Sequence, residues 1–139
     1  MKNLANCKPS EFLIQTNKIR KSVANWLTVT DIMNIRKRLP ELEEAGEGAT
    51  IDERQAVVER NLKKKNEQVK QNLMDILDAM LVDHPTETLE ILALCCFVEP
   101  KDVDNHPMSE YIGAITELIE TKEVMSFFIS LAKLAKIDI

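Results

Sequence analysis

The sequence has very little of the residues from which many recognised sites are built. It has only three glycines and five prolines, and aromatic residues make up 4% of the chain. It contains no glycine pattern of a phosphate-binding loop or dinucleotide-binding turn, and no Gly-x-Ser-x-Gly turn that would present a nucleophilic serine. These absences argue against the common classes of nucleotide-binding and hydrolytic enzymes.

Cysteine and histidine are also sparse. The chain has Cys7, Cys95, Cys96, His84 and His106, without the closely spaced ligand pairs of a structural zinc site. Cys95 and Cys96 lie in an apolar run, where a thiolate is disfavoured. We therefore expect a protein that is not an enzyme, with no catalytic residue, no metal and no cofactor. The thiols are interpreted as reduced, as in a cytoplasm.

Long hydrophobic runs are missing too. The longest, Ile91 to Val98, is far too short to span a bilayer, and the amino terminus lacks the apolar core of a signal peptide. The sequence therefore predicts a soluble, cytoplasmic protein with no membrane partner.

Charge is present but unevenly placed. Residues 1–40 carry a net charge of +6 and residues 41–139 a net charge of −11, for a total of −5. Such a separation can attract the two parts to each other, within one chain or between chains. A domain that binds nucleic acid strongly is usually basic overall, so this balance disfavours a nucleic acid partner.

The composition and periodicity predict an all-α fold, a single-domain helical bundle of five to six helices with one long central helix. An acidic, glycine-containing loop at about residues 41–49 is interpreted as mobile and solvated. A buried strand over residues 91–98 is the alternative to a helix there. The expected helices cover residues 10–28, a short stretch that starts after Thr30 and ends at Pro40, then 50–84, 85 to about 99, 107–121 and 122–134.

The stretch from Thr50 to His84 organises this prediction. Thr50 and Glu53 form a capping box, and Pro85 marks the point beyond which the helix cannot continue. Part of so long a helix should kink, protrude or meet another chain. Its second half, from Val69 to Leu81, is expected to lie in the core, and its charged first half to fray, bend or dock. A seam with coiled-coil spacing runs along it, formed by Leu62, Val69, Leu73, Ile76 and Met80, with polar Asn66 inside it.

Apolar residues at helical spacing supply the candidate partner-binding residues. The adjacent rings of Phe127 and Phe128 cannot both face one narrow core stripe, so one ring is expected to close the bundle end or to contact a partner. The long seam either packs on the chain's own helices or binds another helix. The candidates are Phe127, Phe128, Leu131, Leu62, Asn66 and Val69.

A basic face on the first two helices supports a different hypothesis. Two short helices with phosphate-contacting side chains would imitate a helix-turn-helix, which makes a small DNA-binding or DNA-packaging accessory protein the alternative function. The expected turn lacks glycine, and the acidic remainder of the chain opposes this interpretation. The basic residues are Lys18, Lys21, Arg36, Lys37 and Arg38.

Several segments together resemble the tail assembly chaperones of siphophages and prophages of Gram-positive bacteria. No catalytic signature is among them, and the resemblance rests on the order and the residue pattern of these segments. They are NCKPSEFLIQTNKIRKSVANWL (6–27), DIMNIRKRLP (31–40), HPTETLEILALCCFVEP (84–100) and MSEYIGAITELIETKEVMSFFISLAKL (108–134).

This resemblance implies a mostly helical, non-enzymatic protein that acts in the cytoplasm of the host bacterium and is absent from the mature virion. Its implied partners are the tape measure protein and the major tail (tube) protein, with self-association through the long or terminal helices also expected. The chaperone would keep the long apolar helices of the tape measure protein soluble until tail polymerisation displaces it. The family has no motif that assigns a residue of this sequence to those contacts.

Overall fold

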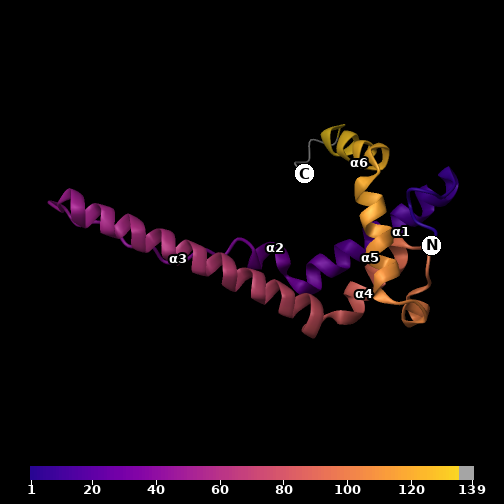
Figure 1. The fold of residues 1–139 in the computed structure, drawn as a ribbon, viewed down its shortest axis with the longest axis horizontal. Coiled ribbons are helices and arrows are strands. Elements are labelled where there is room, and N and C mark those ends of the chain that lie inside the picture. Colours follow the sequence, from indigo (N-terminus) through magenta and orange to yellow (C-terminus); the bar gives the residue numbers. More distant parts are fainter. Residues whose placement is uncertain (135–139) are drawn as a thin grey trace. The chain divides into compact units, whose positions relative to one another are not determined.

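Helices form all the regular secondary structure of the described part of the chain. The computed structural model describes residues 1–134, which contain six α-helices and no strand (Figure 1). The predicted all-α fold with one long helix is therefore confirmed, and the alternative of a strand over residues 91–98 is wrong. The α-helices are α1 (Pro9–Thr30), α2 (Ile32–Ile35), α3 (Ile51–Asp78), α4 (Pro85–Cys95), α5 (Met108–Glu120) and α6 (Lys122–Leu134).

Two further helical turns complete the path. A π-helical turn, Ala79–Asp83, continues α3, and the amide of His84 donates to the carbonyl of Ala79 at 2.9 Å. A 3-10 helix, Pro100–Asn105, connects α4 to α5. In the long helix the π turn fills the span between α3 and Pro85, so the predicted helix from Thr50 to His84 is present with one change of helical type.

The chain divides into two compact units. One contains residues 1–26 and the described residues from Thr86 onward, and the other contains residues 27–85. The first boundary falls inside α1, between Trp26 and Leu27. A boundary inside a continuous helix has no linker composition, which is why the sequence indicated only one domain over residues 1–139.

The core of the first unit lies where α4 and α5 meet. Tyr111 is almost completely buried, together with Cys96 and Ala114. The Tyr111 hydroxyl donates to the carbonyl of Val103 at 2.8 Å, which satisfies its one polar atom in the core. The apolar end of α4 therefore lies at the centre of this unit. Half-buried Leu92, Cys95, Val98 and Val103 pack around this core.

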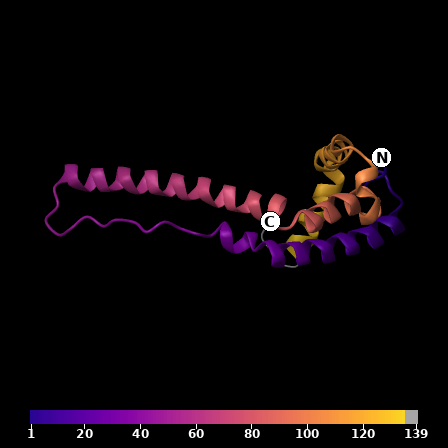
Figure 2. The same ribbon diagram turned by 90° about the horizontal axis from the view of Figure 1, so that it is seen from below.

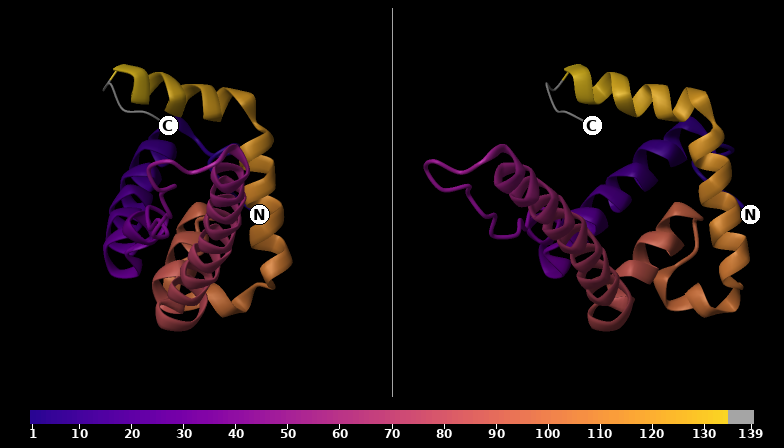
Figure 3. Two further views of the ribbon diagram at one scale, coloured as in Figure 1. Left: turned by 90° about the vertical axis from the view of Figure 1, so that its left-hand side faces the viewer. Right: turned by 60° about the vertical axis from the view of Figure 1, so that its left-hand side comes forward.

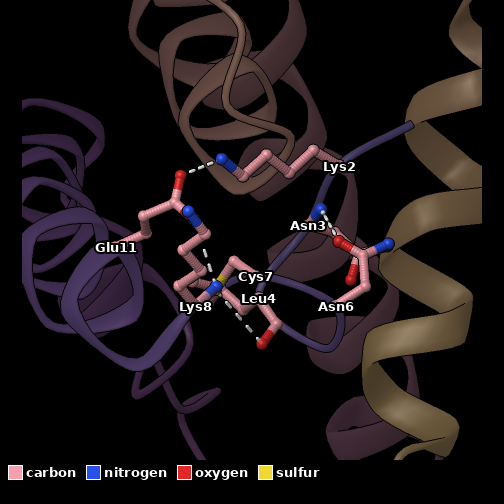
Figure 4. Close-up of polar contacts among 7 residues, drawn as sticks. All are labelled: Lys2, Asn3, Leu4, Asn6, Cys7, Lys8 and Glu11. Carbon is pink, nitrogen blue, oxygen red and sulfur yellow. Dashed lines mark hydrogen bonds and ion pairs between the residues drawn. The ribbon is translucent and has the colours of Figure 1, made fainter.

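A network of polar contacts holds the amino-terminal segment in place before α1 (Figure 4). The amide of Asn3 donates to Asn6 Oδ1 at 2.9 Å, and the carboxylate of Glu11 accepts from the backbone amide of Lys8 at 3.1 Å and pairs with Lys2. Asn3 itself is buried and donates from Nδ2 to Glu117 of α5 at 3.3 Å. The segment is thereby joined to the carboxy-terminal helices of its unit.

The carboxy-terminal helices α5 and α6 belong to the same unit. Thr121 separates them, with an extended ψ of 100° and an amide that donates to the carbonyls of Glu117 and Leu118. The chain therefore leaves α5 at an angle before α6 begins (Figure 3). The two boundaries agree with the predicted helices over 107–121 and 122–134.

In the second unit, α3 begins as its sequence predicted. The amide of Glu53 donates to the Thr50 side-chain oxygen at 3.1 Å, and Asp52 and Glu53 lie at the positive end of the helix dipole. Its 28 residues are about 42 Å long at ~1.5 Å per residue.

The segment between α2 and α3 lies along α3 as an extended strap, which we define as residues 38–50 (Figure 2). At one end, Asn72 Nδ2 of α3 donates to the carbonyl of Arg38 at 3.0 Å. Further along, the Asn61 side chain accepts from the amide of Glu43 and donates to its carbonyl, each at 2.9 Å. Asn61 therefore bonds to both backbone groups of one residue, as a neighbouring strand would.

The spacing of these contacts matches the two backbone geometries. Eleven residues separate Asn61 from Asn72, which is about 16.5 Å along an α-helix. Five residues separate Arg38 from Glu43, which is also about 16.5 Å along an extended chain. An extended strap antiparallel to α3 is therefore the conformation that both asparagines can bind at once.

Charge adds to the attachment of the strap. Arg60 Nε lies 2.7 Å and Lys64 Nζ 3.6 Å from the Glu43 carboxylate, and the hydrogen bond from Arg60 lowers the pKa of that carboxyl below its ordinary value. Arg38 pairs with Asp75 at 3.2 Å. These pairs are exposed, so the asparagine contacts are the more specific part of the attachment.

The strap corrects two predictions. Residues 41–49 have no helix, as expected, but Glu43 is paired with α3 rather than merely solvated. The second helix ends at Ile35 and not at Pro40, because the amides of Lys37 and Arg38 make only short turn bonds and α3 takes over the Arg38 carbonyl.

We predict that Asn61→Ala releases the strap. The substitution removes two hydrogen bonds to Glu43, and cleavage by a glutamate-specific protease at Glu41, Glu43, Glu44 and Glu47 should accelerate about tenfold. Alanine favours helix, so α3 itself should not be weakened. Asn66→Ala, an exposed change on the same helix, is the matched control. Equal cleavage rates in the two variants would show that Asn61 does not hold the strap.

Candidate partner-binding surface

A stripe of apolar side chains, interrupted by polar Gln55 and Asn66, runs along the face of α3 beside the strap. At about 100° per residue, its members fall within a sector of about 60° of the helix surface. The side chains that bind the strap, such as Asn61 and Asn72, are centred about 100° away around the helix. We call this set the α3 stripe. It consists of Ile51, Val58, Leu62, Val69, Leu73, Ile76 and Met80.

Most of the α3 stripe is exposed. The exposed fractions of Leu62, Val69 and Leu73 are 58%, 66% and 55%, while Ile76 and Met80 are half-buried. The prediction that Val69 to Leu81 lies in the core is therefore wrong for this chain, and Leu81 is exposed as well. The strap covers a polar face of α3, so it leaves the apolar seam uncovered.

The sequence prediction missed the amino-terminal end of the stripe. Ile51 and Val58 lie eleven and four residues before Leu62, on the same side of α3 and next to the line of the heptad seam, and both are exposed. The charged residues between them concealed this regularity. The stripe therefore extends over the whole of α3.

Polar side chains lie beside the middle of the stripe. Asn66 is exposed, next to a shallow hollow of about 380 Å³ that Leu62, Lys63, Glu59 and Lys70 also line. Asn66 lies at a seam position. A polar residue there favours one register between two paired helices and lowers their affinity. Leu62, Asn66 and Val69 thus form one surface, as the seam predicted.

The second group of candidates gathers around α1 and α6 in the first unit. The Phe12 ring lies 5.6 Å from Phe127 in an edge contact and 5.9 Å from Phe128 in a stacked one, measured between ring centroids. Phe127 remains 42% exposed and Phe128 is half-buried. Leu131 lies on α6, but its side chain is outside the described residues.

Another exposed apolar face was missed on α5. Met108, Ile112 and Ile119 are exposed along one side of the helix, while Tyr111 and Ala114 on another side are buried. Ile119 is 62% exposed and lies outside the core. The spacing of four and seven was visible, but α5 has apolar residues on two faces, so periodicity alone does not identify the covered one.

The basic residues do not gather on one helix pair. Lys18 and Lys21 line a hollow of about 670 Å³ in the first unit, together with Glu90 and Glu99. Arg36, Lys37 and Arg38 belong to the second unit and follow α2, which has only four residues. Arg38 is paired with Asp75. The prediction of two basic helices is therefore wrong for the second one. Lys18 and Lys21 lie on α1, but Arg36, Lys37 and Arg38 follow the end of α2.

The cysteines and histidines have structural surroundings. Burial raises the pKa of Cys95 to about 11 and also raises the pKa of Cys96, so both thiols favour the protonated form. His106 Nδ1 lies 2.8 Å from the Glu110 carboxylate. Across residues 1–134, no three side chains of the metal-binding types come together as a candidate ion site.

Membrane crossing and similarity to known proteins also bear on function. Within residues 1–134, no helix combines the length and apolar character that crossing a membrane requires. Comparison with protein-family models, with curated proteins and with solved structures found no match to this chain. The apolar surface itself and the sequence resemblance are therefore the indications of function that this chain offers.

We predict different costs for the two neighbouring rings of α6. Phe128→Ala should lower the free energy of unfolding by about 2 kcal/mol, since the half-buried ring stacks on Phe12, and Phe127→Ala by about 1 kcal/mol or less. Urea denaturation followed by Trp26 fluorescence measures both. A loss of about 3 kcal/mol at each position would mean that both rings belong to the core and that neither is available to a partner.

Proposed function

We propose that this chain is a non-enzymatic, helix-binding assembly protein, a tail assembly chaperone of a siphophage or prophage. The observation that carries the proposal is the exposed α3 stripe, a set of largely exposed apolar side chains on one face of a long helix. The sequence resemblance names the partners: the tape measure protein, whose helices the stripe would cover, and the tail tube subunit. In this proposal the chain acts in the cytoplasm of the host bacterium and is absent from the mature virion.

The stripe has the character that reversible helix binding requires. A seam with positions at intervals of three and four contacts one face of a partner helix, as in helix-in-groove recognition. Full burial of one large apolar side chain contributes about 1.5–3 kcal/mol, and association itself costs about 4–15 kcal/mol. A few such side chains therefore suffice for binding that a later assembly step can displace.

The exposed ring of Phe127 supports the same function from the other unit. An accessible aromatic side chain on α6 offers a second apolar contact of the kind that binds helices. It is a short surface, whereas the α3 stripe continues over many turns. We therefore assign the main contact to α3.

The DNA-binding alternative has less support. A recognition helix must be long enough to lie in the major groove, and α2 is about 6 Å long at ~1.5 Å per residue. Arg36 and Lys37 lie beyond its end, and Arg38 is engaged with Asp75. No observation in the described residues favours this alternative over helix binding.

Co-expression tests the proposed function directly. With the tape measure protein encoded by the same phage or prophage, this chain should increase the soluble fraction of that protein and be recovered with it in a pull-down. The matched control is co-expression of a variant with the stripe disrupted. Unchanged solubility and no recovery with the unaltered chain would contradict the chaperone proposal.

Two adjacent residues of equal exposure separate stripe binding from general hydrophobicity. Leu73 lies on the stripe, whereas Met74 points about 100° away, and each is 55% exposed. We predict that Leu73→Ser weakens partner binding about tenfold or more, the equivalent of one lost apolar contact, and that Met74→Ser leaves it nearly unchanged. Isothermal titration calorimetry with the partner segment recovered in the pull-down measures the affinity of both variants. Equal effects would mean that the stripe is not the contact.

A further inference from the structure

Three lysines, with Glu59 and Glu67 near them, border the centre of the α3 stripe, so lysines outnumber carboxylates there. Lys63, Lys65 and Lys70 are exposed, and within the described residues none of them pairs with a carboxylate. Arg60 and Lys64, by contrast, are on the strap side and bind Glu43. The two groups of cations therefore have different roles, and the three lysines remain for a partner.

The seam spacing places these lysines at defined positions of a helix pair. With Leu62, Val69 and Ile76 at position d of the heptad, Asn66 and Leu73 occupy position a. Lys65 then occupies position g, and Lys63 and Lys70 occupy position e. Positions e and g flank the apolar contact and determine which partner pairs with a helix.

This border disfavours a second copy of the chain as the occupant. In a parallel pair, Lys65 of one copy faces Lys70 of the other, and Glu59, at position a, meets its own equivalent. In an antiparallel pair centred on Asn66, Lys63 of one copy lies near Lys70 of the other. Both orientations bring like charges together beside the apolar contact, which acts against self-pairing.

We propose that the occupant of the α3 stripe is an amphipathic helix of another polypeptide whose apolar seam has acidic borders. Glutamate or aspartate at its e and g positions would meet Lys63, Lys65 and Lys70 and would replace repulsion by attraction. A basic or neutral polar residue would face Glu59. This inference rests on the proposed helix-binding function and adds the charge of the partner to it.

Asn66 adds an alignment requirement. A polar side chain at one a position is satisfied best by a polar residue in the same layer of the partner, so it disfavours shifted pairings. The lysines at positions 63, 65 and 70 lie within about one turn of Asn66. Correct alignment at Asn66 therefore also aligns the acidic border with the lysines.

Three synthetic helices test this proposal with the full-length chain. All carry four heptads with Leu at a and d and one Asn at a, and their e and g positions are Glu, Lys or Gln. Fluorescence anisotropy of labelled peptides should show the Glu peptide binding about tenfold or more tightly than the Lys peptide at low salt. The difference should shrink at about 0.5 M salt, where charges are screened.

Charge reversal supplies the matched variants. The variant K63E/K65E/K70E should reverse the preference and bind the Lys peptide more tightly. The variant K101E/K122E/K133E changes the net charge equally but alters lysines of the first unit, and it should keep the original preference. Reversal in the first variant alone locates the selectivity on the stripe border.

The remaining outcomes distinguish the inference from the function on which it rests. Equal binding of the Glu and Lys peptides, lost in Leu73→Ser, would overturn the charge inference and leave helix binding intact. No binding of any peptide would overturn both. In sedimentation equilibrium of the chain alone, the stripe should not mediate self-association. Self-association that Leu73→Ser abolishes would make a second copy the occupant and would also overturn the inference.

Discussion

Two asparagine side chains determine what α3 can present to a partner. Asn61 bonds to both backbone groups of Glu43, and Asn72 bonds to the carbonyl of Arg38. Backbone groups outside helices need partners, and an amide side chain provides a donor and an acceptor at once. The strap is thereby held on a polar face of α3, and the apolar face beside it stays accessible.

The distribution of charge on α3 follows the same division. Cations on the strap side, Arg60 and Lys64, neutralise Glu43, whereas Lys63, Lys65 and Lys70 border the exposed stripe. An apolar seam alone binds many helices with little discrimination, including its own copy. Charges at its border change that outcome, because they repel one class of partner and attract another. Under the proposed function, this arrangement would favour assembly with a different polypeptide over self-pairing.

Local signals account for the parts of the fold that were predicted. Thr50 caps α3 with its side chain, and Pro85 begins α4 after the π turn. The apolar segment around Ala93 and Cys96 lies in the core because its residues have no other favourable environment. The sequence also predicted which residues form the seam. Leu62, Val69 and Leu73 share one face of the helix whatever the helix packs against.

Sequence by itself therefore determined the helices, the ends of most of them and the existence of an apolar seam, because propensity, capping and periodicity act over a few residues. Tertiary structure alone decided which apolar faces are covered. Val69 and Leu73 looked like core residues, yet they are exposed, because the neighbour of α3 is a polar strap held by Asn61 and Asn72. Those contacts join residues 18 and 34 positions apart. No local pattern records a pairing over that distance.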